Sequence, residues 1–230
     1  MLNKIRILTL QFNLPIKLSE VPYFRGAVLK SIGGGADVLF HNHQPESGYR
    51  YSYPLIQYKR LGRNAAIVCI ERGTEMVGQF LSRAPEQLRL GEREVELNLF
   101  NVRPTRVLVQ IWNTMSEYHI SRWLPLNSKN LSQYMAIEDE QERISMLERI
   151  LKANLLSMLK GLNIYLEQEL LLRITELDKP RKLLYKDVGM LAFNAQFVCN
   201  LSIPDNLGVG KNASVGFGVV HRKRETQEQA

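Results

Sequence analysis

The alternation of apolar and polar residues in the first hundred positions constrains the fold of this chain more than any other feature. Residues 5–12 alternate as a half-buried strand does, and residues 23–32 carry apolar side chains on one side of a helix. The elements predicted here are, in order, a strand at 5–12, a helix at 23–32, strands at 51–59 and 64–72, a helix at 73–81 and a strand near 95–100. Strand, helix, strand, strand, helix, strand is the order of the ferredoxin-like module.

The second half of the chain partly repeats this order. Its predicted elements are strands at 106–112 and 115–123, one long helical stretch at 131–162, strands within 166–177 and 183–203, and a last strand at about 215–221. The second helix of an ideal repeat is missing, and a glycine-rich loop takes its place. We therefore predict an α+β fold of tandem ferredoxin-like domains, the second irregular. The expected domains are residues 1–95 and 96–230.

The charge balance of the chain narrows the class of partner. The formal net charge is +7 and the isoelectric point is about 9.4. A basic surface favours a polyanion, either nucleic acid or an anionic membrane. A solvated basic face without any such partner is the plainer alternative.

The two cysteines and the N-terminal segment bear on the compartment. Cys69 and Cys199 each sit in an apolar run without a second ligand at CxxC spacing, which is typical of buried thiols rather than of zinc sites or disulfides. Residues 1–13 are too short and too polar for a membrane span and carry no cleavage site for a signal peptide. We expect a cytoplasmic protein with no membrane partner.

A pair of histidines follows the first predicted helix. His41 and His43 are two residues apart, so in an extended segment both side chains point the same way. Because an unperturbed imidazole titrates near pH 6.5, the pair can supply a general base and a general acid. Two surface histidines, or a metal site completed by Asp37, are the alternatives. The letters HNH are not the metal-dependent nuclease motif, whose residues are spread over tens of positions, so we predict metal-free chemistry and no cofactor.

Tyrosines and one lysine surround the histidine pair in the sequence. Tyr49 and Tyr51 are candidates for stacking on a base or donating to a phosphate, whereas Tyr53 and Tyr58 are interpreted as structural. Lys30, on the preceding helix, is a candidate for stabilising negative charge on a phosphate, although most lysines at such positions are only solvated.

The glycine-rich segment 208–220 is the second candidate site. It is not a dinucleotide fingerprint, since it leads into a strand and not into a helix, and it is not a Walker A loop, since no serine or threonine directly follows Lys211. A backbone without side chains can come close to a phosphodiester, and Lys211 adds charge. A plain glycine-rich hairpin is the alternative. The predicted RNA-binding residues are Gly208, Gly210, Lys211, Gly216, Gly218, Arg60 and Arg63.

Three features together resemble one known family. They are the order of elements along the chain, the histidine segment followed by SYPLIQYK at 52–59, and GVGKNASVGFG at 208–218. The chain resembles the CRISPR precursor-RNA processing endoribonucleases, the sixth Cas family of the RAMP superfamily, and is most similar to its b-type subgroup. The resemblance covers nearly all of the chain.

This resemblance implies metal-independent cleavage of CRISPR repeat RNA. The 2′-hydroxyl of the RNA would attack the adjacent phosphate and leave a 2′,3′-cyclic phosphate, with His41 and His43 as the acid–base pair in either order and with Lys30 and Tyr49 or Tyr51 assisting. The implied partners are pre-crRNA and other Cas proteins, with the chain as a monomer or homodimer. A non-catalytic RNA-binding RAMP subunit is the competing hypothesis, and His41 and His43 discriminate between the two.

Overall fold

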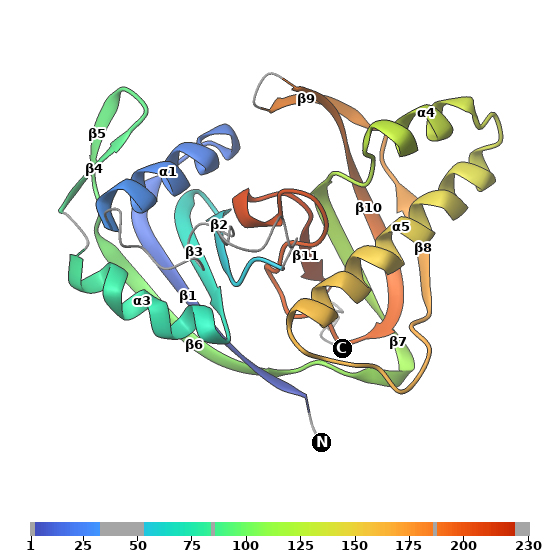
Figure 1. Cartoon of the computed structure of the whole chain (residues 1–230), viewed down its shortest axis with the longest axis horizontal. Helices are drawn as coiled ribbons and strands as arrows, with labels where there is room; N and C mark the ends of the chain where they lie inside the picture. The colour runs from blue at the N-terminus through green and yellow to red at the C-terminus, as the bar shows by residue number, and fades with distance from the viewer. Residues whose placement is uncertain (1–2, 33–52, 84–85, 186–187, 224–230) are drawn as a thin grey trace, which may run out of the picture. The chain divides into compact units, whose positions relative to one another are not determined.

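The structure is a computed structural model that describes residues 3–32, 53–83, 86–185 and 188–223. The chain forms two compact units (Figure 1). The N-terminal unit comprises Lys4–Leu108 together with Ala213–Gly216, and the C-terminal unit is built mainly from Val109–Asn212 and the segment that begins at Phe217. None of the helices in these described ranges combines the length and apolar character that a bilayer crossing requires.

The N-terminal unit has the topology of a ferredoxin-like domain. Its antiparallel sheet has the order β2-β3-β1-β6, with helices α1 and α3 packed next to each other and against its strands. Its elements are β1 (Lys4–Pro15), a short 3-10 turn η1 (Leu18–Glu20), α1 (Val21–Ile32), β2 (Ile56–Leu61), β3 (Asn64–Ile70), α3 (Arg72–Arg83), a hairpin of β4 (Gln87–Leu90) and β5 (Arg93–Glu96), and β6 (Leu99–Leu108). The β4–β5 hairpin is an insertion before the last strand of the module.

An aromatic cluster fills the core of this unit. The Phe12 ring on β1 meets Phe24 of α1 at 5.9 Å and Phe80 of α3 at 6.2 Å between centroids, and Phe24 in turn meets Tyr58 of β2 at 5.9 Å. All four side chains are at most 1% exposed. Edge-to-face pairs of this kind add to the free energy of simple burial. The interpretation of Tyr58 as a structural residue is therefore confirmed.

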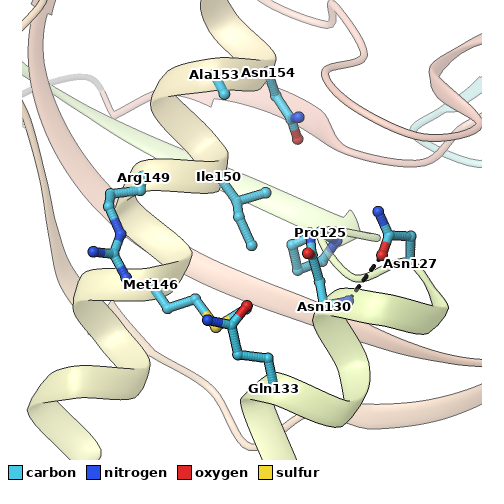
Figure 2. Close-up of a pocket in the computed structure, with 9 residues that line it drawn as sticks. All are labelled: Pro125, Asn127, Asn130, Gln133, Met146, Arg149, Ile150, Ala153 and Asn154. Carbon is cyan, nitrogen blue, oxygen red and sulfur yellow. Dashed lines mark hydrogen bonds between the residues drawn. The ribbon is translucent and has the colours of Figure 1, made fainter.

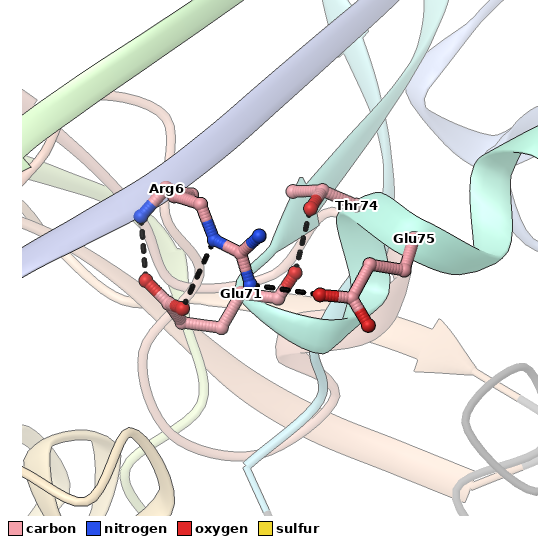
Figure 3. Close-up of polar contacts among 4 residues, drawn as sticks. All are labelled: Arg6, Glu71, Thr74 and Glu75. Atoms are coloured by element: carbon pink, nitrogen blue, oxygen red, sulfur yellow. Dashed lines mark hydrogen bonds and ion pairs between the residues drawn. The ribbon is translucent and has the colours of Figure 1, made fainter.

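A polar network ties the first strand to the start of α3 (Figure 3). Glu71 accepts from the Arg6 backbone N–H at 2.5 Å, and the Arg6 guanidinium pairs with Glu75 at 2.9 Å. The Thr74 hydroxyl donates to the Glu71 carbonyl at 2.7 Å, which closes the first turn. Because the Arg6 side chain is 46% exposed, solvent weakens the ion pair, and the network acts mainly by fixing where α3 begins.

The C-terminal unit repeats the strand order with one helix replaced. Its sheet has the order β11-β7-β10-β8, with β9 paired to the first half of β10. Its elements are β7 (Ile111–Trp123), α4 (Ser128–Ala136), α5 (Glu140–Gly161), β8 (Leu172–Leu177), β9 (Arg181–Tyr185), β10 (Val188–Leu201) and β11 (Val219–Arg222). Residues 202–218, all described, contain no α-helix between β10 and β11 and hold the glycine-rich loop with the 3-10 turn η2 (Ala213–Val215). The predicted irregular second repeat is confirmed.

Helix α5 is amphipathic and covers the sheet of its unit. Leu147, Leu151 and Leu155 recur at helical spacing and are fully buried. The helix begins where the Asp139 carboxylate accepts from the backbone N–H of Glu142 at 2.8 Å, a standard cap for an otherwise unpaired donor.

Three predicted elements are corrected by the structure. The stretch 131–162 is not one helix, because residues 137–139 are outside helical geometry and Asp139 caps a second helix, α5. The strand predicted at 106–112 spans the end of β6 and the start of β7. These two strands belong to different sheets, and the apolar alternation of the sequence continues across the connection between them. The strand near 95–100 likewise spans the end of β5 and the start of β6.

The ends of the predicted elements shift at two further places. The last strand begins at Val219 and not at 215, because Gly216 and Gly218 have positive φ angles that interrupt an extended chain. Within the described residues, the strand predicted at 51–59 begins at Ile56. The compact units divide the chain between Leu108 and Val109. The division into domains at residues 1–95 and 96–230 stays a prediction.

Candidate functional site

The histidine segment, residues 41–51, lies outside the described residues. His41, His43, Tyr49 and Tyr51 therefore stay predictions, as does the alternative metal site that includes Asp37. The helix before this segment, α1, is described, and so is the strand β2 after it.

Lys30 lies in the last turn of α1, close in sequence to the histidine segment. Its side chain is exposed, and it makes no hydrogen bond or ion pair with any described residue. A cation at the C-terminal end of a helix is favoured by the helix dipole. Lys30 is thus a solvated cation available to an anionic ligand, and its catalytic role stays a prediction.

Lys59 is a basic residue that the sequence interpretation did not single out. It lies on β2 opposite Ala66 of β3, and its side chain is 1% exposed. Among the described residues its ammonium has no hydrogen-bond partner, and burial lowers the pKa of this group from 10.5 to about 7. Because Tyr58 and Lys59 point to opposite faces of the strand and both are buried, β2 is covered on both sides.

The burial of Lys59 limits what it can do. A lysine with a pKa near 7 has the acid–base properties that catalysis uses. No phosphate, however, can reach an ammonium that is enclosed on all sides. In this conformation Lys59 therefore affects stability and its dependence on pH. The only sequence signal that could have pointed to Lys59 was its position at the end of SYPLIQYK. Its burial could not be predicted, because the tertiary fold decides whether both faces of a strand are covered.

Segment 208–220 contains two buried glycines with positive φ angles, Gly216 and Gly218. At Gly218, where φ is +60°, an added Cβ would lie 1.9 Å from the Val209 carbonyl oxygen. At Gly216, where φ is +80°, it would lie 3.5 Å from Val21. Gly208, Gly216 and Gly218 are all buried. Contact of these three glycines with RNA stays a prediction. The structure gives a reason for glycine at positions 216 and 218, because other residues rarely adopt their positive φ angles.

Gly210 and Lys211 form the accessible part of the loop. The Trp123 indole donates to the Asn154 side-chain oxygen at 3.0 Å, and a Cβ at Gly210 would lie 2.5 Å from that same oxygen. The loop backbone therefore rests against the side chain of Asn154 on α5. Lys211 follows with an exposed side chain, and it has no ion pair with a described residue.

Phe217 anchors the other end of the loop within the C-terminal unit. The Arg122 guanidinium lies 4.2 Å above its ring, and Tyr185 of β9 meets it edge-on at 5.4 Å. Burial lowers the pKa of Arg122, yet a guanidinium stays charged at any physiological pH. This stacking holds the loop next to the β9 hairpin.

The two arginines of the β2–β3 hairpin have different surroundings. The Arg60 side chain donates to the Gly62 carbonyl at 2.8 Å, so it closes its own turn. Arg63 is exposed and its guanidinium has no ion pair within the described part of the chain. Of the two, Arg63 is the freer cation for a phosphate.

Further exposed cations lie at the turn from β8 to β9. Lys179, Arg181 and Lys182 are exposed, and the neighbouring Asp178 accepts from Asn194 at 3.0 Å. None of the three cations forms an ion pair with a described residue.

The two cysteines are fully buried and free, and burial raises the pKa of each thiol to about 12. The interpretation of the cysteines as buried thiols is confirmed.

Comparison with known proteins identifies the family. A family model described as the Cas6b N-terminal domain matches residues 3–106, and one described as the Cas6b C-terminal domain matches residues 110–223. The chain belongs to the Cas6b family. The b-type resemblance found in the sequence is thereby confirmed.

Solved structures support the membership of the chain in the Cas6b family. A crystal structure of Cas6b is 27% identical with a TM-score of 0.87, and the match covers 96% of this chain and all of that one. A second, titled as a CRISPR RNA processing endoribonuclease Cas6b, is 26% identical with a TM-score of 0.73 over the same shares. A Cas6 product complex, 11% identical with a TM-score of 0.56, covers 95% of this chain and 99% of that one and shows the fold alone.

One curated relative extends the comparison. An uncharacterised protein of Methanocaldococcus jannaschii is 36% identical over 113 residues, which is 49% of this chain and 76% of that protein. Together with the solved structures, the Cas6b match confirms the predicted fold of tandem ferredoxin-like domains.

Proposed function

We propose that this chain is an endoribonuclease that cuts CRISPR repeat RNA to release crRNA, without a metal ion. The observation that carries the proposal is the likeness over 96% of the chain to a structure titled as a CRISPR RNA processing endoribonuclease. The surplus of positive charge supports an RNA partner, since cations on the protein replace the counterions of the phosphates.

The proposed reaction is an internal transfer within the RNA. The 2′-hydroxyl oxygen bonds to the adjacent phosphorus while the bond from phosphorus to the 5′-oxygen breaks. One of His41 and His43 takes the proton from the 2′-hydroxyl, and the other gives a proton to the leaving 5′-oxygen. The products are a 2′,3′-cyclic phosphate and a 5′-hydroxyl. Lys30, an exposed cation, and Tyr49 or Tyr51 are proposed to stabilise the charge on the phosphate.

The proposed RNA-binding residues fall into two groups. Lys211 and Arg63 are exposed cations, suited to phosphates. Arg60 and the glycines at positions 208, 210, 216 and 218 are proposed to act by shaping the hairpin and the loop beside them, which the positive φ of Gly210, Gly216 and Gly218 supports.

The test is a cleavage assay with labelled repeat RNA from the source genome in EDTA. We expect one cut that persists in EDTA and disappears when the nucleotide before it is 2′-deoxy. His41→Ala and His43→Ala should each lower the rate by about 10²- to 10⁴-fold. His119→Ala, a histidine of β7 outside the proposed site, is the matched control and should cut at the wild-type rate.

Two other results would decide against the proposal. Tight binding of repeat RNA without any cut would make the chain an RNA-binding RAMP subunit, as the exposed cations alone would allow. Cleavage that stops in EDTA and returns with a divalent ion would replace the acid–base mechanism with a metal-dependent one.

A further inference from the structure

The C-terminal unit contains a pocket between α4 and α5 that is separate in sequence from the histidine segment (Figure 2). Its volume is about 580 Å³, within the range of small-molecule sites. Asn130 and Gln133 line it from α4, and Met146, Arg149, Ile150 and Asn154 line it from α5.

Three polar side chains of this pocket, those of Asn130, Gln133 and Arg149, are available to a ligand. Asn130 donates its backbone N–H to the side-chain oxygen of Asn127 at 2.8 Å. Its side-chain amide has no partner among the described residues. The Gln133 amide and the Arg149 guanidinium likewise have no partner among the described residues, and both side chains are exposed. No carboxylate lines the pocket. The lining is therefore neutral or positive and contains both donors and acceptors.

Apolar atoms form the rest of the pocket wall. Met146 is 5% exposed and Ile150 is half-buried. Figure 2 shows Gln133 reaching from α4 towards Met146, with Ile150 pointing into the space between the two helices. A flat aromatic ring can lie against these apolar atoms while its edge meets the amides. That combination, an apolar wall with a few amides, matches the face and the edge of a nucleobase.

The pocket adjoins the accessible part of the glycine-rich loop. Asn154, at one end of the pocket, is the residue against which the Gly210 backbone rests, and Lys211 follows with an exposed ammonium. A strand of RNA with one phosphate at Lys211 can thus extend towards the pocket, whose lining residues include no carboxylate. Arg149, exposed at the pocket, supplies a second cation for a phosphate of the same strand.

We infer that the α4–α5 pocket is a subsite for one unpaired nucleotide of RNA. The amides of Asn130 and Gln133 hydrogen-bond the edge of its base, and Arg149 binds its phosphate. The inference rests on the proposed function, because it assigns one contact of the same RNA. It also gives the chain a source of sequence preference, since amides that bind base edges distinguish bases, whereas cations that bind phosphates do not.

The test measures binding and base preference together. Repeat RNA with a 2′-deoxy nucleotide at the cut is titrated in EDTA with wild-type protein and with the double variant Asn130→Ala, Gln133→Ala, and each unpaired base of the RNA is changed in turn. We expect wild-type affinity to fall roughly tenfold for a change at one position. In the double variant that difference should vanish, with the other positions unaffected. Gln141→Ala, an exposed amide of α5 outside the pocket, is the control.

Arg149→Gln separates the phosphate contact from the base contact. It should weaken all RNAs alike and reduce the slope of log K against log salt by about 0.7. Lys160→Gln, a charge removed from the same helix outside the pocket, should leave the slope unchanged. With cleavable RNA in single-turnover experiments, the pocket variants should raise the protein concentration at half-maximal rate and leave the maximal rate unchanged, as expected of a binding subsite.

The outcomes distinguish the failure of this inference from that of the proposed function. If wild type binds and cuts RNA but the double variant keeps its affinity and base preference, the subsite is refuted, and a peptide or another ligand is the better occupant. If wild type neither binds nor cuts repeat RNA, the proposed function fails and the subsite with it. Crosslinking of 4-thiouridine RNA to residues 127–154, read by mass spectrometry, supports the subsite independently of any variant, and crosslinks confined to other segments overturn it.

Discussion

Replacing Lys59 by methionine should stabilise the protein at neutral pH. The ammonium is 1% exposed, makes no hydrogen bond to a described residue, and has a pKa lowered by burial from 10.5 to about 7. Each unit of such a pKa shift corresponds to about 1.4 kcal/mol, so burying the charged ammonium lowers the free energy of unfolding by up to roughly 5 kcal/mol below pH 7. Methionine has a similar length and needs no hydrogen bond. Because relaxation of the site reduces the cost, we expect Lys59→Met to gain at least about 2 kcal/mol at pH 7.

The sign of the pH dependence follows from the same shift. Between about pH 7 and 10.5 the unfolded chain keeps the Lys59 proton and the native protein releases it. The unfolded state then binds more protons, so the free energy of unfolding rises with pH in this window through this group. Below pH 7 both states are protonated and the full cost remains. The advantage of Lys59→Met should therefore be largest near pH 6 and shrink steadily towards pH 10.

The assay is urea unfolding followed by far-UV circular dichroism at several pH values between about 6 and 10. All other titrating groups are shared, so the difference between wild type and variant isolates Lys59. Lys4→Met, an exposed lysine of β1 in the same unit, is the matched control and should show no pH-dependent difference. A Lys59→Met protein that is less stable at pH 7, or whose difference from wild type does not change with pH, would refute the reasoning and indicate a charged, partnered ammonium.

Three further predictions concern the loop, the long helix and the exposed cations. Gly218→Ala should lower the free energy of unfolding by well over the roughly 1–2 kcal/mol of a left-handed backbone, because its Cβ would lie 1.9 Å from a carbonyl oxygen. Gly62→Ala, at a similar φ but with no atom near its Cβ, is the control and should cost only the backbone amount. Equal losses for the two variants in urea unfolding would contradict the clash. Asp139→Ala should lower the unfolding free energy by about 1 kcal/mol by removing the cap of α5; no loss would mean that the cap is not needed. Lys211→Gln and Arg63→Gln should each reduce the salt slope of RNA binding by about 0.7, and an unchanged slope would exclude that cation from the interface.

The predicted element order agrees with the structure where apolar periodicity and local breakers coincide. Phe24 and Val28 fall at helical spacing and α1 forms there, while the turn at Gly62 separates two strands that pair with each other. The missing helix of the second repeat was also evident, because segment 202–218 contains glycines and no helical apolar stripe. Errors occurred where the partner of a strand changes without a change in composition, as from β6 to β7.

The candidate residues divide in a similar way. A pattern of residue types is enough to select His41, His43 and Lys211, because their chemistry is a property of each side chain and its neighbours along the chain. Pattern does not report which side chains are enclosed. The burial of Lys59 depends on cover over both faces of β2, and the pocket of Asn130 and Gln133 depends on the break that separates α4 from α5.

The sequence by itself determined the order of elements, the double ferredoxin-like repeat, the family and the residue types offered for chemistry, because these follow from local periodicity and from motifs read along the chain. Only the tertiary structure decided which glycines are required by backbone contacts, which lysine is buried without a partner, and which amides of two neighbouring helices share one pocket. The physical reason is that burial and proximity are set by segments distant in sequence. Gly218 meets Val209 and Gly210 meets Asn154 through the fold, and no pattern along the chain reports those distances.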